Sequence, residues 1–277
     1  MTIDLVFITY DRLEYTKLSL ASVLADPSEQ FSLTIWDNAS TDGTIDYLRN
    51  EVRDTRIKQV VFSPKNVGQI AVLNQVWGDS DADLLGKLDN DCILTPGWSR
   101  TLAQAHQDIP ELGVIACWHF MPEDFNFEKA SHKIQQFGRH RILRHPWTCG
   151  TGLLVKRETY ERMGPMPGEG TTQYWLGMAR AGYVNGFYYP LICQEHMDDF
   201  RSKYNRTRWM SFEKAYKTTD SWHRGDVRNY EDWEHMHKRI LENLLTGPFE
   251  ANYYYRPLWK RVWKRAMAAL STSKARP

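Results

Sequence analysis

Two carboxylates that directly follow an apolar run are the residues of this sequence best placed to do chemistry. Residues 84–89 read Leu-Leu-Gly-Lys-Leu-Asp, and the chain continues with Asn90 and Asp91. At the carboxyl end of a buried parallel strand, such carboxylates would face the crevice where open α/β sheets bind ligands. Oxygen ligands in that position suit Mg²⁺ or Mn²⁺, whose coordination is usually completed by substrate phosphates. Taken alone, these residues fit a polar Asp-Asn turn at least as well.

The segments before these carboxylates alternate between strand and helix patterns. The apolar run at residues 3–9 is typical of a strand that is covered on both faces, and apolar residues on a helical period follow it. The whole pattern predicts strands at 3–9, 32–36, 57–62 and 84–89, and helices at 13–24, 45–49 and 69–77. Four alternations over about ninety residues indicate βαβ units and therefore a parallel, doubly wound sheet.

Beyond Asp91 the pattern is less regular. Residues 121–145 are charged and aromatic without a sustained period, and their basic cluster at 139–145 suits either an anionic ligand or a solvated loop. The remaining segments predict helices at 98–106, 156–163 and 172–181, strands at 112–118, 147–155 and 188–193, and a helical region at 200–245.

Composition and charge narrow the class of protein. The 35 Lys and Arg residues balance 34 Asp and Glu residues, so the net charge of +1 gives no overall field for nucleic acid, and we expect none as a partner. The cysteines Cys92, Cys117, Cys149 and Cys193 lack metal-binding spacing, and residues 1–9 lack a signal-peptide pattern. No apolar run has the length of a membrane span. We therefore expect reduced thiols and a cytoplasmic protein.

Four segments carry a resemblance to a known family. They read FITYDR at 7–12, IWDNASTDGT at 35–44, NVGQIAVLNQ at 66–75 and GKLDNDCILTPGW at 86–98. In this order and at these separations they resemble the nucleotide-sugar-binding half of family 2 glycosyltransferases, which are nucleotide-diphospho-sugar transferases of the GT-A fold. The resemblance is good over residues 3–120, continues loosely to residue 200 and fades beyond it.

This resemblance implies an α/β protein with the Rossmann-like GT-A fold, in which helices cover both faces of a mostly parallel, doubly wound sheet. The glycosyltransferase domain would span residues 1–200, with a nucleotide-sugar-binding half at 1–95 and an acceptor-side half at 96–200. Residues 201–277 would form a helical C-terminal extension. Its last segment, 256–276, has the pattern of a basic amphipathic helix. Such a helix either attaches peripherally to the inner face of a membrane or packs on the protein body or a second subunit of a homo-oligomer.

The resemblance also assigns donor-binding residues. Asp37 would accept a hydrogen bond from the ring N–H of the base, and Asp89 would hold the ribose or a metal-bound water. Asp91, with Asp89 beside it and His196 as an additional ligand, would bind the Mn²⁺ or Mg²⁺ that bridges both phosphates. A UDP-sugar is the favoured donor. The predicted donor-binding residues are Thr9, Tyr10, Arg12, Asp37, Asn66, Gly68, Lys87, Asp89 and Asn90.

Simpler explanations stay open for single residues. Lys65, which would balance phosphate charge, and Lys87 fit solvated charges equally well. His196 fits a structural histidine equally well. Residues 42–43, an Asp-Gly pair, fit a turn better than a ligand contact.

The acceptor side is marked by small residues before an apolar strand. In the family such a segment lines the pocket beside the donor sugar, so Gly150 and Thr151 would line it here and Trp147 would offer a ring platform. Family members carry an acidic pair before the next helix, but this sequence has Gly170 and Thr171 at those positions. We nominate the nearest carboxylate, Glu169, as the catalytic base, with an exposed loop glutamate as the alternative.

These features predict an inverting, metal-dependent glycosyltransferase of the hexosyltransferase type, as used in polysaccharide biosynthesis. It would transfer a sugar from a nucleoside diphosphate sugar to a hydroxyl of a saccharide or lipid-linked acceptor. One alternative is a sugar nucleotidyltransferase, although that class places a glycine-rich basic loop where residues 9–12 read Thr-Tyr-Asp-Arg. The other is a non-catalytic carbohydrate-binding protein on the same fold, which the missing acidic pair keeps open.

Overall fold

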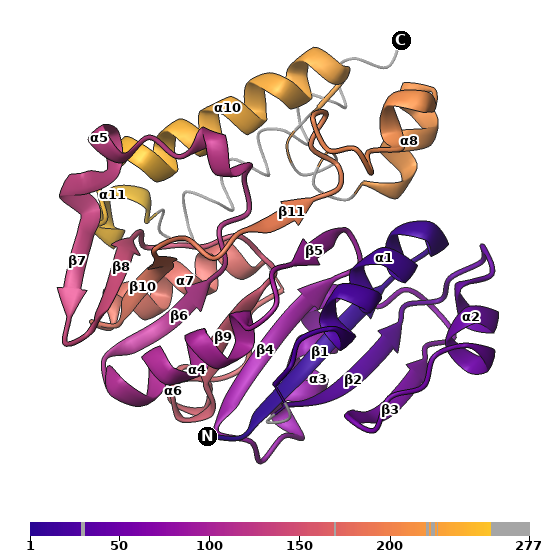
Figure 1. The fold of residues 1–277 in the computed structure, drawn as a ribbon, viewed down its shortest axis with the longest axis horizontal. Helices are drawn as coiled ribbons and strands as arrows, with labels where there is room; N and C mark the ends of the chain where they lie inside the picture. The colour runs from indigo at the N-terminus through magenta and orange to yellow at the C-terminus, as the bar shows by residue number, and fades with distance from the viewer. Residues whose placement is uncertain (29–30, 169, 220–221, 223–224, 226, 256–277) are drawn as a thin grey trace, which may run out of the picture.

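A nine-stranded sheet forms the centre of the molecule (Figure 1). The computed structural model describes residues 1–28, 31–168, 170–219, 222, 225 and 227–255. The strand order is β3-β2-β1-β4-β9-β6-β10-β8-β7, and β5 and β11 form a separate two-stranded sheet. The strands are β1 (Ile3–Thr9), β2 (Phe31–Asp37), β3 (Ile57–Phe62), β4 (Leu84–Asp89), β5 (Cys92–Leu94), β6 (Leu112–Ala116), β7 (Ile134–Phe137), β8 (His140–Arg144), β9 (Leu153–Lys156), β10 (Val184–Tyr189) and β11 (Gln194–His196).

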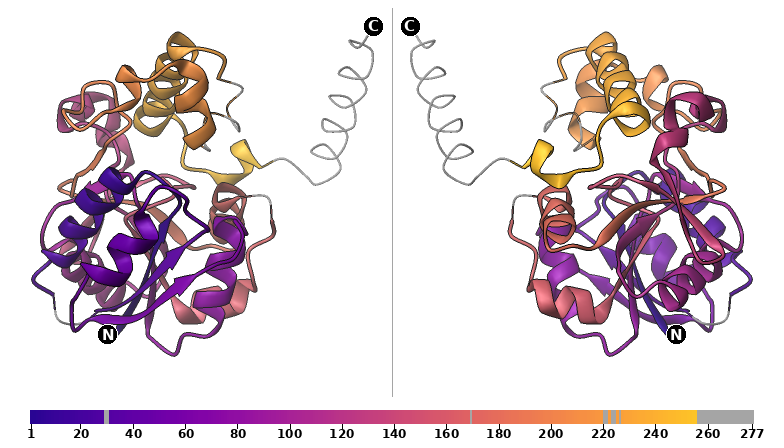
Figure 2. Two further views of the ribbon diagram at one scale, coloured as in Figure 1. Left: turned by 90° about the vertical axis from the view of Figure 1, so that its right-hand side faces the viewer. Right: turned by 90° about the vertical axis from the view of Figure 1, so that its left-hand side faces the viewer.

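Helices cover both faces of this sheet (Figure 2). Side chains of β1 alternate between the two sides, so that Leu5 and Phe7 pack in the layer with α1 and α4, whereas Val6 and Ile8 pack in the layer with α3 and α7. The helices are α1 (Leu13–Leu24), α2 (Thr44–Asn50), α3 (Gln69–Gly78), α4 (Trp98–Asp108), α5 (Phe127–Ala130), α6 (Arg157–Met163), α7 (Thr171–Arg180), α8 (Phe212–Thr218), α10 (Tyr230–Thr246) and α11 (Ala251–Tyr254), with single 3₁₀ turns η1 (Pro122–Asp124), η2 (Ser131–Lys133) and η3 (Thr207–Trp209).

The predicted βαβ half is confirmed, and the sheet as a whole is mixed. Strands β3, β2, β1 and β4 are parallel, and β1 is buried along its whole length, as its continuous apolar run predicts. On the other side of β4 the direction changes, because β9 runs antiparallel to both β4 and β6. Parallel pairing resumes between β6 and β10, and the β7–β8 hairpin closes the edge.

Two strand predictions need correction. The strand expected at 188–193 lies at 184–189 instead, and the next strand, β11, begins only at Gln194. Asn185 and Gly186 hide this strand in the sequence, because neither residue type favours a strand. Packing explains both residues. The buried Asn185 side chain donates to the carbonyls of Pro146 and Trp175 and accepts from the Val114 N–H. At position 186 only glycine fits, because a Cβ there would lie 2.3 Å from the Leu143 carbonyl oxygen. The strand expected at 147–155 is also shorter, since β9 begins only at Leu153.

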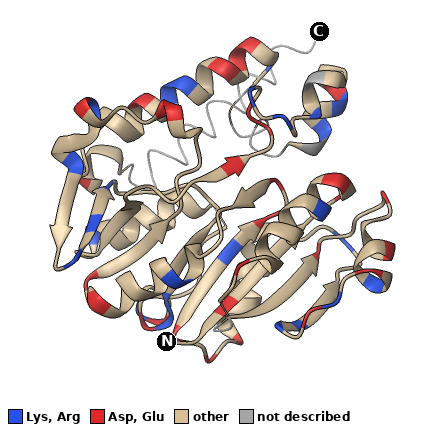
Figure 3. Ribbon diagram, viewed as in Figure 1, with Lys and Arg blue, Asp and Glu red and all other residues tan. Residues whose placement is uncertain are grey.

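The C-terminal part of the described chain is helical, as predicted. Helix α10 crosses above the sheet, next to α5, and α11 lies next to α7 (Figure 1). Basic and acidic residues are interspersed along α10 (Figure 3), which agrees with the balanced composition. None of the described helices is both long enough and apolar enough to span a bilayer. The predicted basic helix at 256–276 lies outside the described residues.

Candidate active site

The carboxyl ends of three neighbouring parallel strands bring predicted donor-binding residues to one edge of the sheet. Thr9 at the end of β1 pairs with Asp37 at the end of β2, and Ile8 pairs with Asp89 at the end of β4. Asp37 is fully buried; one carboxylate oxygen accepts the Ser40 N–H at 3.0 Å, and Oδ2 has no hydrogen-bond partner among the described residues. An unpaired buried acceptor suits a ligand N–H, since buried polar atoms are normally hydrogen-bonded.

The predicted residues Asn66 and Gly68 lie in the loop that leads into α3. Asn66 accepts from the Asn38 side-chain amide at 2.8 Å and from the Gly68 N–H at 2.9 Å, and Asn38 in turn accepts from the Val67 N–H. These bonds join the loops after β2 and β3. Gly68 has a φ of +76°, which favours glycine at the start of the helix. Lys65 is exposed beside them.

Buried hydrogen bonds of Thr9 and Asn90 connect the ends of β1 and β4. The Asn90 amide donates to the Thr9 hydroxyl, the Thr16 hydroxyl and the Asp11 carbonyl, each at 3.1 Å. Both predicted residues are buried, so they shape the turn after β1 rather than present themselves to the surface. Tyr10, in contrast, is 40% exposed.

That turn carries backbone strain. Asp11 and Arg12 both have positive φ values, +50° and +62°, which costs energy in residues other than glycine and is concentrated at functional sites. The Asp11 N–H donates to Ser40, and the Asp11 carboxylate accepts from the Thr41 N–H at 2.6 Å. Asp42 accepts the Leu13 N–H at 2.7 Å at the start of α1, which supports the turn interpretation of residues 42–43.

The strained turn directs Arg12 into a cluster of opposite charges. Its guanidinium pairs with Asp198 and lies 3.5 Å from Asp91, and it stacks over the Tyr15 ring at 4.1 Å. The Asp198 side chain is fully buried, and the sequence analysis missed it. Its position two residues after His196, beyond the last predicted strand, was the available signal.

Asp91 and His196 come together, as the resemblance implied for metal ligands. The antiparallel pairing of β5 with β11 places them 3.6 Å apart, from Oδ2 to Nε2. Burial opposes ionisation of Asp91, but the hydrogen bond and charge of His196 and the charge of Arg12 outweigh it, so the pKa of Asp91 is lowered. Burial likewise lowers the pKa of His196, but bonding to Asp91 and its charge raise it above the ordinary value.

These residues fit a divalent cation. Ligand atoms of Asp91, His196 and Asp198 lie within 4.8 Å of one another. Oδ2 of Asp198 is buried without a hydrogen-bond partner among the described residues. Two carboxylates and one imidazole are acceptable to Mn²⁺, while Mg²⁺ prefers oxygen ligands alone. Asp89 is not part of this group.

Asp89 is instead held by a buried lysine. Lys87 is fully buried, and its Nζ donates to Asp89 Oδ1 at 2.7 Å and to the Gly150 carbonyl. The solvated-charge explanation of Lys87 is therefore wrong. The Asp89 N–H also donates to the Thr151 hydroxyl at 2.8 Å. Two residues predicted for the acceptor side therefore contact the Lys87–Asp89 pair, Gly150 through Lys87 and Thr151 through the Asp89 backbone.

The other acceptor-side predictions have different outcomes. Thr171, the first residue of α7, lies close to Gly150, so the loop before α7 leads to this site. Glu169, the predicted base in that loop, lies outside the described residues. Trp147 packs edge-on against His145 and Tyr254, with ring centroids 4.5 Å and 6.5 Å away, and is part of the core beneath α11.

A cavity of about 550 Å³ adjoins the charged cluster. Its wall includes Trp233, whose ring centroid lies 6.4 Å from that of His196, and Asp199, the neighbour of Asp198. Tyr230 adds a second aromatic side chain to the cavity wall. Arg201, which also lines the cavity, donates to both Asp124 and Asp199. Aromatic faces combined with charged hydrogen-bonding groups suit a polar ligand with apolar faces, such as a sugar.

Three comparisons place this architecture among known proteins. A search of curated proteins found no match. Among solved structures, the mannosyltransferase PcManGT from Pyrobaculum calidifontis, in complex with GDP-Man and Mn²⁺, has a TM-score of 0.59 at 17% identity, over 98% of this chain and 80% of its own. GalNAc-T7 with UDP, GalNAc and Mn²⁺ has a TM-score of 0.54 at 12% identity, over 71% of this chain and 44% of its own.

A third structure, S. aureus TarS in complex with UDP-GlcNAc, has a TM-score of 0.50 at 14% identity, over 70% of this chain and 58% of its own. Similarity at these identities shows the GT-A fold. The sequence profile of the family described as "Glycosyl transferase family 2" matches residues 4–163, more than half of the chain and the whole βαβ half. The chain therefore belongs to glycosyl transferase family 2.

Proposed function

We propose that this protein is an inverting, metal-dependent glycosyltransferase that transfers a sugar from a nucleoside diphosphate sugar to a hydroxyl of a saccharide or lipid-linked acceptor. The observation that carries the proposal is the convergence of Asp91, His196 and Asp198 beside Arg12, at the strand ends where Asp37 has an unpaired acceptor. The GDP-Man and Mn²⁺ bound by PcManGT, and the UDP, GalNAc and Mn²⁺ bound by GalNAc-T7, support it.

Each part of the donor has a matching group at this edge. Asp37 accepts from the base, and the Asp89 carboxylate, fixed by Lys87, holds the ribose. Asp91 and His196 hold the cation, with Asp198 as a further ligand. When bound, the cation acts as a Lewis acid on the leaving diphosphate. Arg12 lies 3.5 Å from Asp91, so its guanidinium would also help to neutralise the negative charge of the diphosphate.

We assign the acceptor to the cavity beside Trp233, because this wall lies next to His196 and offers both ring faces and hydrogen-bonding groups. A base must remove the proton of the acceptor hydroxyl as that hydroxyl attacks the anomeric carbon. We retain Glu169 for this role. The supporting observation is that Thr171, two residues later, lies close to Gly150 and therefore to the Lys87–Asp89 pair.

Replacing Asp91 tests the cation site. We expect Asp91→Asn to lower sugar transfer by about a hundredfold or more, since the charge on the leaving group loses its main stabilisation. Removing the metal with a chelator should have the same effect. The measurement is turnover of GDP- and UDP-sugars with Mn²⁺. Asp108→Asn is the control, because Asp108 lies before β6 at the opposite end of the sheet. Absence of any donor binding by the wild type, or full activity of Asp91→Asn, would overturn the proposal.

Glu169→Gln tests the base separately. We expect kcat to fall by about a hundredfold or more with donor affinity unchanged, because a general base acts on the acceptor and not on the nucleotide. The measurement is kcat with saturating donor, together with calorimetric donor binding. Retained turnover would assign the base to another group and leave the transfer activity itself in place.

A further inference from the structure

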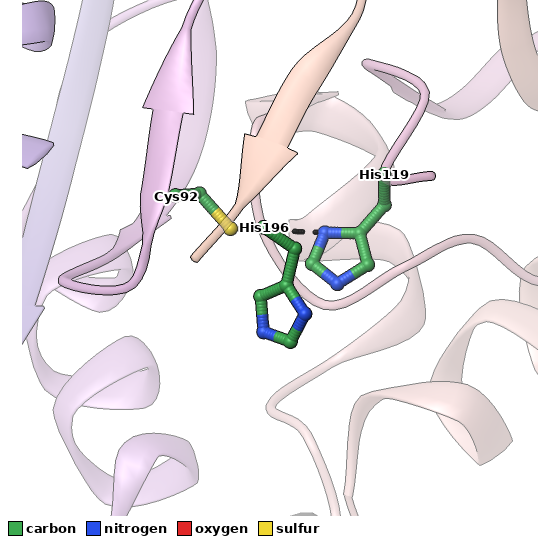
Figure 4. A group of neighbouring side chains, drawn as sticks. All are labelled: Cys92, His119 and His196. Atoms are coloured by element: carbon green, nitrogen blue, oxygen red, sulfur yellow. Dashed lines mark hydrogen bonds between the residues drawn. The ribbon is translucent and has the colours of Figure 1, made fainter. Parts of the chain in front are cut away.

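A second group of potential metal ligands shares His196 with the first (Figure 4). Cys92, His119 and His196 each offer one ligand atom, and these atoms lie within 4.8 Å of one another. Cys92 and His196 face each other across the β5–β11 pair, and His119 comes from the segment after β6. Neither Cys92 nor His119 is a ligand in the donor site proposed above, but the Cys92 thiol lies 3.5 Å from Asp91 Oδ1, to which it donates a weak hydrogen bond.

The two ring nitrogens of His196 have different surroundings. Nε2 lies 3.6 Å from Asp91. Nδ1 is buried and has no hydrogen-bond partner among the described residues. The imidazole of His119 lies beside that of His196, with ring centroids 4.3 Å apart. An unpaired buried nitrogen next to a second imidazole needs a partner, and a cation would supply one.

The contact between Cys92 and His119 has the dimensions of a metal site. Sγ lies 3.7 Å from Nδ1 of His119. In a tetrahedral zinc site, with bonds of about 2.3 Å to sulfur and about 2.0–2.1 Å to nitrogen, two such atoms are about 3.6 Å apart. The observed distance therefore requires almost no rearrangement. A weak S–H···N hydrogen bond is the competing explanation of this contact.

We propose that Cys92, His119 and Nδ1 of His196 form a zinc site, with the fourth position open to water. A thiolate with two imidazoles selects Zn²⁺ over Mg²⁺ and Mn²⁺, which prefer oxygen. On binding, the Cys92 thiol loses its proton to solvent, and the zinc–sulfur bond replaces the S–H bond. Access is available because His119 is half-exposed.

The consequence for activity rests on the proposed function. A neutral imidazole has one ring nitrogen free to bind a metal and a proton on the other. Zn²⁺ on Nδ1 therefore leaves the proton on Nε2, so His196 is lost as a ligand on the Asp91 side. Zinc and the donor cation then oppose each other, and by linkage each lowers the affinity of the other. The site makes the enzyme sensitive to inhibition by zinc.

Cobalt titration of the full-length protein tests the site directly. Co²⁺ replaces Zn²⁺ in such sites, and a thiolate–cobalt bond gives a charge-transfer absorption in the near ultraviolet. We expect this band in the wild type, its displacement by Zn²⁺, and its loss in Cys92→Ser. His119→Gln should weaken zinc binding by more than about tenfold. Cys193→Ser is the matched control, since Cys193 lies in the same region but outside the ligand group.

The outcomes separate the two proposals. No thiolate–cobalt band in the wild type, or an unchanged band in Cys92→Ser, overturns the zinc site and assigns the contact to a hydrogen bond. A band that persists in Asp91→Asn supports a site separate from the donor cation. If the band forms but no donor binds with Mn²⁺, the zinc site stands and the proposed transferase function fails.

Discussion

Two aspartates only two positions apart have different chemical surroundings. Asp89 is neutralised by the buried Lys87, whereas Asp91 faces His196 and Arg12. The first is therefore held in a fixed orientation by the protein, and the second is the one that shares a ligand group with other metal donors. Their spacing at a strand end predicted a site, but the division of roles follows from their partners, which are Lys87 for Asp89 and the distant Arg12 and His196 for Asp91.

Lys87→Met tests the positioning of Asp89. We expect the free energy of unfolding to fall by about 1–3 kcal/mol, because the Gly150 carbonyl and the Asp89 carboxylate both lose their donor. Donor affinity should fall as well, since Asp89 is no longer fixed. Urea unfolding and calorimetric donor binding measure the two effects. Lys65→Met, at an exposed lysine of the same edge, is the control, and equal stability of both variants would contradict the prediction.

At the scale of elements, helix α4 is fastened to the central sheet by a buried histidine. Nε2–H of His106 donates to the Leu154 carbonyl of β9 at 3.0 Å. Burial lowers the pKa of His106 from the usual 6.5 to about 3, outweighing the bond to Leu154. The imidazole is therefore neutral in the folded protein across the range in which an unfolded chain takes up a proton.

This contact makes stability depend on pH. Between pH 6.5 and 3 the unfolded state binds more protons at His106 than the folded state does. The contribution of this group to the free energy of unfolding is therefore complete above pH 6.5 and is lost as the pH falls towards 3. The slope from this one group reaches at most about 1.4 kcal/mol per pH unit. We expect urea unfolding of His106→Gln to depend less steeply on pH in this window than that of His132→Gln, the exposed control. An equal dependence of unfolding free energy on pH in the two variants would contradict this prediction.

At the scale of the whole molecule, a buried lysine joins the C-terminal helices to the glycosyltransferase body. Lys133 of η2 donates to the Leu244 carbonyl in the last turn of α10 at 2.6 Å and to His145 at 2.9 Å. Burial lowers the pKa of Lys133 to about 8. Because α10 supplies Trp233 to the wall beside His196, this bond also helps to hold the proposed acceptor cavity in place.

Lys133→Met should loosen α10 without unfolding the sheet. Loss of the bond to Leu244 is expected to cost about 1–3 kcal/mol locally, so amide hydrogen exchange in α10 should quicken by about ten- to hundredfold while β1 and β4 remain protected. Lys129→Met is the matched control, because its ion pair with Glu242 links α5 to the same helix but is half-exposed and worth at most about 1 kcal/mol. Equal exchange in both variants would count against the buried lysine.

The sequence by itself determined the local pattern of the βαβ half and the residues at its strand ends. Apolar patterns predicted β1, β2 and β4, and the polar residues at the ends of β2 and β4 placed Asp37, Asp89 and Asp91 at one edge, because the carboxyl ends of parallel strands lie at the same edge of a sheet. Local rules suffice for these strands and their ends, because successive βαβ units run in the same direction and bring their carboxyl ends together even where, as for β1 and β4, the paired strands are far apart in sequence.

Only the tertiary structure decided which of those residues meet. Three features depend on contacts between residues far apart in sequence. They are the antiparallel strand β9, the strand β10 with its buried Asn185, and the β5–β11 pair. Burial of Lys87 and the approach of Asp198 to Arg12 follow from those contacts. Two side chains interact when they are close in space, and a sequence pattern predicts such closeness only for residues that are near one another in the chain.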